Sequence, residues 1–106
     1  METTMFSGSH SPLDLAKRVL SSETLENVSR APFSMQGWKV LDRWALNSPE
    51  QLEALERQGL VLLMDRVLQQ QRLETEVLTS EAALLALRSG QTEEEVLQAN
   101  EVTTAL

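Results

Sequence analysis

The side chains with the most chemical potential in this sequence are paired glutamates. Glu53 and Glu56, and later Glu74 and Glu76, stand two or three residues apart. Paired carboxylates can share acid–base work, or hold a metal when histidine completes the set. The chain has no cysteine, and its one histidine, His10, stands in a stretch of serine and glycine. We therefore expect solvated charges on a helix, with no enzyme activity and no metal or cofactor site.

A second chemical possibility is DNA binding by the C-terminal part of the chain. Residues 81–88, a Ser-Gly-Gln turn and residues 92–100 have the length of a helix-turn-helix. A recognition helix presents its N-terminal residues to the groove, and here these are Glu93, Glu94 and Glu95. Three negative charges would face phosphate, so we expect a plain helical hairpin and no direct contact with nucleic acid.

Composition places the chain among small acidic helical proteins. The 106 residues are 42% apolar, and 16 acidic residues against 9 basic ones give a formal charge of −7. An acidic surface disfavours nucleic acid and anionic membranes and favours a basic or partly apolar protein partner. No stretch resembles a signal peptide or a membrane span, so we expect a cytoplasmic protein. Residues 1–11 are expected to be a flexible tail, and residues 12–106 a single helical domain.

Five helices are expected from apolar periodicity and capping residues. Their expected ranges are residues 12–30, as two short helices or one bent at Ser21-Ser22, and residues 35–46, 48–79, 81–88 and 92–103. Gly90 fits a left-handed C-terminal cap, and Thr92-x-x-Glu95 has the form of a capping box. The fold class is therefore all-α, a small domain with one long central helix.

The long helix carries the most informative feature, the apolar run Leu60-Val61-Leu62-Leu63-Met64. Five consecutive apolar residues make every side of a helix apolar, so the run must be covered on every side. The chain has few elements to do this, which favours a second copy or another protein as the cover. Gly59 precedes the run and is either a weak point in the helix or a site of close helix approach.

Two tryptophans on the preceding helix, Trp38 and Trp44, are also interface candidates, since tryptophan is enriched at binding hot spots. Six positions separate them, so they do not share a stripe. The simplest interpretation places Trp38 in the core and Trp44 half-buried with a solvated N–H. The full set of expected partner or dimer interface residues is Trp38, Trp44, Leu55, Gly59, Leu60, Leu62, Leu63, Met64 and Val67.

The segment 43–52 (RWALNSPEQL), followed by the leucine-rich helix with Gln69-Gln70-Gln71, resembles the QslA-type quorum-sensing anti-activators, small helical proteins of pseudomonads. The likeness extends over most of the chain and rests on no diagnostic motif. The resemblance implies an all-helical homodimer that binds the ligand-binding domain of a LuxR-type transcriptional activator. Such binding prevents the activator from dimerising and holding its operator. A small secretion chaperone or structural dimer that covers an apolar client segment is the alternative.

Overall fold

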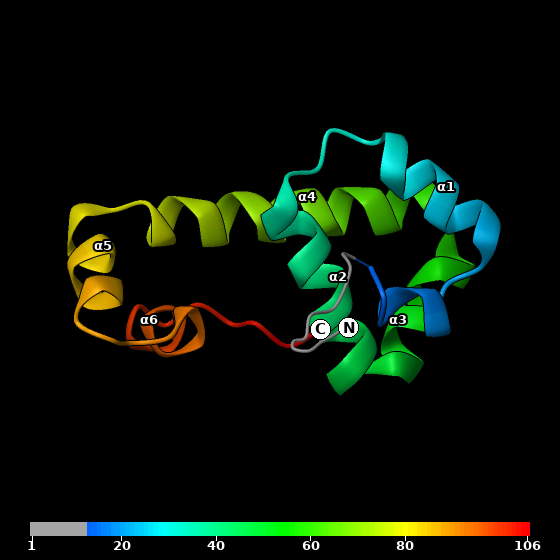
Figure 1. The fold of residues 1–106 in the computed structure, drawn as a ribbon. Coiled ribbons are helices and arrows are strands. Elements are labelled where there is room, and N and C mark those ends of the chain that lie inside the picture. Colours follow the sequence, from blue (N-terminus) through cyan, green and yellow to red (C-terminus); the bar gives the residue numbers. More distant parts are fainter. Residues whose placement is uncertain (1–12) are drawn as a thin grey trace, which may run out of the picture.

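The computed structural model describes residues 13–106, and within this range the fold is all helical (Figure 1). The fold class expected from the sequence is confirmed. The tail expected over residues 1–11, with His10, lies outside the described residues. The elements are a 3-10 turn η1 (Ala16–Arg18) and the helices α1 (Ser22–Arg30), α2 (Met35–Asn47), α3 (Pro49–Gln58), α4 (Leu60–Leu78), α5 (Glu81–Arg88) and α6 (Glu93–Ala99).

Short side chains set the start of most helices. Ser21, Ser34 and Ser80 each accept a hydrogen bond from a backbone N–H in the first turn of the following helix. Thr92 and Glu95 form the expected capping box at the start of α6. These four helix starts are therefore predictable, because each depends on residues next to one another in the chain.

The long helix expected over residues 48–79 is interrupted, and this expectation was wrong. Gly59 lies at φ +131° and ψ 147°, so α3 ends at Gln58 and α4 begins at Leu60. Only glycine adopts this backbone region without strain. No atom lies within 4 Å of the position that a Cβ would take, so Gly59 is not a site of close helix approach. Gly59 is therefore a weak point of the expected helix, and the helix is completely broken there.

A different glycine, Gly37, lies against a side chain of a neighbouring helix. A Cβ added to this buried residue of α2 would collide with the amide oxygen of Gln71 on α4 and lie 3.1 Å from the Cβ of Phe33. That amide oxygen also accepts a hydrogen bond of 2.9 Å from the backbone N–H of Ser34. Gly37 therefore leaves room for the Gln71 amide, which bonds α4 to the start of α2.

The two ends of the described chain also differ from expectation. The N-terminal end forms only the single turn η1 before α1, with its first N–H groups bonded to Asp42 on α2. The last helix was expected to reach residue 103 but ends at Ala99, because Glu101 adopts a left-handed φ of +61°. The N–H of Val102 then bonds back to the carbonyl of Leu97, and the chain leaves the helix.

Apolar residues form two clusters along α4. The first joins η1, α1, α2, α3 and the N-terminal half of α4, and the second joins the C-terminal end of α4 with α5, α6 and Val102. Figure 1 shows α4 as a long bar, with α1 and α3 at one end, α5 and α6 at the other, and α2 near its middle. Residues 100–106 run back from α6 toward α2. The two cores are separate apart from α4, so the fold needs side-chain contacts that join them.

We predict that Gly59→Ala lowers the free energy of unfolding by about 1–3 kcal/mol, because alanine is strained at this φ and ψ. Urea denaturation followed by circular dichroism measures the loss. Gln58→Ala, an exposed helical position beside it, is the control and should change stability by less than about 0.5 kcal/mol. An unchanged or more stable Gly59→Ala would mean that α3 and α4 are one helix.

Glu56 makes stability dependent on pH. Burial acts to raise the pKa of its carboxyl, but hydrogen bonds from Ser21 and Thr24 and the charge of Arg57 outweigh it, so the pKa lies below its ordinary value of 4.5. The backbone N–H of Ser21 donates at 2.8 Å. A lowered folded pKa contributes stability above the unfolded pKa, and this is lost as pH falls through the folded pKa.

Glu56→Gln should therefore be less stable than the parent at neutral pH and should lose less stability on acidification below pH 4.5. Thermal melts over an acid-to-neutral pH series test this. Glu53→Gln, an exposed glutamate on the same helix, should follow the parent curve. Parallel curves for Glu56→Gln and the parent would show that Glu56 plays no part.

Candidate functional site

A buried carboxylate joins the two halves of the molecule. Glu74 on α4 is fully buried, and Arg43 on α2 donates to both of its oxygens, at 2.6 Å and 2.7 Å. Gln36 Nε2 donates to Oε1 at 2.9 Å, and Gln70 Nε2 donates to Oε2 at 2.7 Å. A carboxylate has about four acceptor sites, and all four are used. The charge is therefore compensated within the fold.

The same cluster holds residues 103 and 104 against α2 and α4. Trp44 Nε1 donates to the Thr104 carbonyl at 3.0 Å, and Gln70 Nε2 donates to the Thr103 carbonyl at 2.8 Å. The guanidinium of Arg66 lies 5.0 Å from the centroid of the Trp44 ring. The chain beyond α6 thus packs back onto the first core, and Leu106 packs against that core.

The expected roles of the two tryptophans are reversed. Trp44 is 1% exposed and its N–H is bonded, whereas Trp38 is half-buried. The Nε1 atom of Trp38 is buried and has no hydrogen-bond partner among residues 13–106. Trp44 is covered by the C-terminal segment, which lies 60 residues away in sequence, so its spacing on α2 could not reveal this.

Glu74 was also misjudged as a solvated charge. Gln70 and Glu74 are both buried. The available signal was their register: Leu63, Val67, Gln70, Glu74 and Leu78 follow one another at spacings of four and three and form the buried stripe of α4. Two polar residues on an otherwise apolar stripe indicate a buried polar partner.

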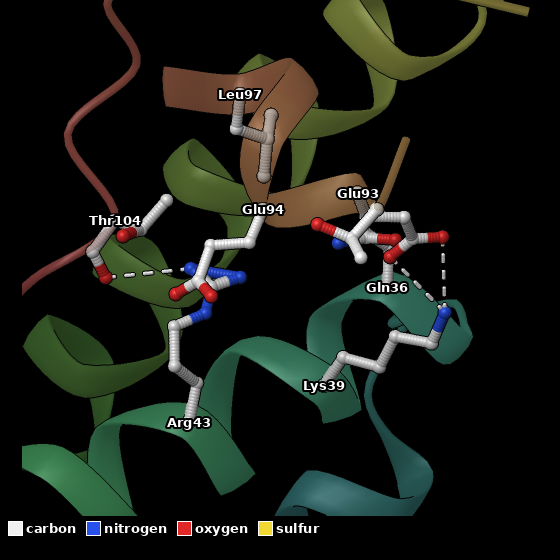
Figure 2. Close-up of a pocket in the computed structure, with 8 residues that line it drawn as sticks. Gln36, Lys39, Arg43, Glu93, Glu94, Leu97 and Thr104 are labelled. Carbon is white, nitrogen blue, oxygen red and sulfur yellow. Dashed lines mark hydrogen bonds and ion pairs between the residues drawn. The ribbon is translucent and has the colours of Figure 1, made fainter. Parts of the chain in front are cut away.

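A cleft of about 310 Å³ lies between α2 and α6 (Figure 2). Its cations already have anionic partners, because Lys39 Nζ lies 3.3 Å from Glu93 Oε2 and Arg43 is bonded to Glu74. Figure 2 shows Glu94 in the same cleft, reaching toward Arg43. The cleft is therefore lined by both positive and negative side chains. A phosphate ligand could bind the cations there only by displacing the carboxylates that already pair with them. Across residues 13–106, no three His, Cys, Asp or Glu side chains are placed to hold a metal.

The expected interface residues divide into three groups. Trp44, Leu63 and Val67 are core residues and present no surface to a partner. Their burial is a correction, and it arises because α2, α3 and residues 104–106 pack around the start of α4. The residues that are half-buried are Trp38, Leu55, Gly59, Leu60 and Met64. Only Leu62 is exposed, at 51%.

The apolar run is therefore covered on one side only. Leu63 faces the core, while Val61 is 72% exposed beside Leu62. Leu73, farther along α4, is 45% exposed, and Leu84 and Leu85 on α5 are exposed as well. A groove of about 470 Å³ runs between α4 and residues 100–103, with Leu73, Val77 and Val102 among its lining residues.

The α4 stripe, defined as Leu62, Arg66, Gln69 and Leu73, lies on one flank of the helix. Leu62 and Leu73 are eleven positions apart, about 20° past three full turns. No protein-family model, curated protein or solved structure matches the chain. No helix in residues 13–106 has the length and apolarity that a membrane span requires.

We predict that Arg43→Leu costs about 3–5 kcal/mol of unfolding free energy, because it leaves the fully buried Glu74 charge without its partner. Glu74→Leu should cost less, because the Arg43 that it leaves without a partner is only partly buried. The double variant should cost far less than the sum of the two, as urea denaturation can show. Lys39→Leu, which removes an exposed ion pair, is the control and should cost less than about 1 kcal/mol. Additive costs would show that the two side chains are not coupled.

Proposed function

We propose that this chain is a regulatory binding protein, an anti-activator that binds the ligand-binding domain of a LuxR-type transcription factor. Binding blocks dimerisation of the activator and hence its hold on DNA. The proposal rests on Val61 and Leu62 at the start of α4, which stay exposed to solvent although their neighbour Leu63 is buried in the core. Adjacent exposed apolar side chains on a charged protein are typical of a protein-binding surface.

The energy available from this pair suits competition with another protein's dimer interface. Full burial of a valine or leucine side chain is worth about 1.5–3 kcal/mol, and these two side chains are roughly half to three-quarters exposed. Covering both contributes roughly 2–4 kcal/mol, and about 1.4 kcal/mol changes affinity tenfold. The net charge of −7 favours a partner with basic residues around the contact.

A secretion chaperone is the second candidate, and the groove beside α4 favours it. Its apolar lining could accept an extended client segment. In that function the client would be unfolded, whereas an anti-activator binds a folded domain. The state of the bound protein distinguishes the two functions.

Size-exclusion chromatography with light scattering tests the proposal on the chain mixed with a LuxR-type ligand-binding domain in its ligand-bound form. We expect one joint peak whose mass shows the activator dimer replaced by a mixed complex. Leu62→Glu should abolish that peak while circular dichroism shows an unchanged fold, because Leu62 is not part of the core. Leu46→Glu, at a leucine that is 64% exposed on α2, is the matched control and should still give the joint peak.

Separate peaks for the parent chain and an unchanged activator dimer would refute the anti-activator function. A joint peak that survives Leu62→Glu would assign the contact to another surface. Binding only to an unfolded, extended client would support the chaperone.

A further inference from the structure

Residues 103–106, called the strap, lie outside any helix and pack across α2 and α4. Thr104 and Leu106 are half-buried, whereas Thr103 and Ala105 are exposed. This alternation is the period of an extended chain that lays one face on a surface. Leu106 packs against the first core. The strap therefore contacts the rest of the molecule through one face only.

The hydrogen bonds that hold the strap all end on its carbonyl groups. Gln70 Nε2 donates to the Thr103 carbonyl at 2.8 Å, and Trp44 Nε1 and Arg43 Nη1 donate to the Thr104 carbonyl at 3.0 Å and 3.3 Å. The strap's own N–H groups donate no hydrogen bond within residues 13–106. Bonds to main-chain groups give affinity for an extended segment without reading its sequence.

These donors are held in place by groups other than the strap. Glu74 bonds both Arg43 and Gln70, and the guanidinium of Arg66 lies over the Trp44 ring. The site therefore stays formed when the strap leaves, which lowers the cost of binding a new segment. Only the Trp44 N–H loses its single partner on opening. An unpaired donor is unfavourable, so a replacement carbonyl is favoured over an empty site.

We propose that Gln70, Trp44 and Arg43 form a binding site for an extended segment of another protein, which displaces the strap. The segment offers consecutive carbonyls to Gln70 and Trp44. It carries a leucine or similar apolar residue two positions after the second carbonyl, where Leu106 lies in the strap.

The position of Thr104 sets the charge of the segment. Thr104 lines the cleft between α2 and α6 together with Arg43 and Glu94, and Figure 2 shows these three side chains close together. A charged residue of either sign at this position would meet a like charge, so an uncharged residue fits best. The strap satisfies the same requirements in cis, and its occupancy lowers the apparent affinity for the partner segment.

Fluorescence anisotropy of a labelled peptide with the sequence of residues 101–106 tests the site on the full chain. Leu106→Asp should bind the peptide about tenfold more tightly than the parent chain, because its own strap has lost its apolar contact with the core. Ala105→Asp, at the exposed neighbouring position, is the matched control and should bind as the parent does. A peptide with aspartate in place of its leucine should bind none of the three chains.

The indole N–H signal of Trp44 in NMR spectra locates the bound peptide, and Trp38→Phe assigns that signal. Leu106→Asp should shift it, because the Thr104 carbonyl holds this N–H less well. Added peptide should return the signal toward its position in the parent chain. If circular dichroism shows that Leu106→Asp is unfolded, Leu106→Ala takes its place, with a smaller gain in affinity and the same return of the signal.

Three results would overturn the inference: no binding at millimolar peptide, equal affinity of the parent and the Leu106 variant, or bound peptide that leaves the Trp44 signal unmoved. The inference does not rest on the proposed function, because no activator is present in the test. Leu62→Glu should lose the activator and keep the peptide, so the two proposals can fail separately.

Discussion

The fold depends on one fully buried carboxylate. An unpaired charge inside a protein costs several kcal/mol, so Glu74 is tolerated only because Arg43, Gln36 and Gln70 occupy all of its acceptor sites. This requirement fixes where α2 crosses α4. The Gln71 amide on α4, which bonds to Ser34 at the start of α2, occupies the space beside Gly37.

The same cluster determines which surfaces remain open. Because Gln70 and Trp44 take the carbonyls of Thr103 and Thr104, the chain after α6 returns along α4 and seals the first core. One side of α4 is therefore buried against the rest of the chain. Beside this buried side, Leu62 and Leu73 stay partly exposed, and Leu73 lines the groove that α4 forms with residues 100–103. The proposed contact with an activator follows from this division of one helix.

Local features of the fold were predictable from the sequence, and long-range ones were not. The capping box at Thr92 and the helix starts near residues 35 and 48 depend on neighbouring residues, so they were predictable from local patterns. The break at Gly59 was missed because a glycine in a helix interior lowers stability by only about 1 kcal/mol, which alone does not end a helix. The break depends on the way α3 folds back onto α4, which the local sequence does not show. The candidate site was harder still, since Arg43 and Glu74 meet across 31 positions.

Native-state hydrogen exchange tests most directly whether the Glu74 cluster joins the two cores into one cooperative unit. Amides in α2, in the C-terminal half of α4 and in α6 should open with the same free energy, equal to that of global unfolding. Opening of α5 and α6 at a clearly lower free energy, with α2 still protected, would contradict the account. The second core would then be a separate unit, and the buried carboxylate would stabilise only the contact between α2 and α4.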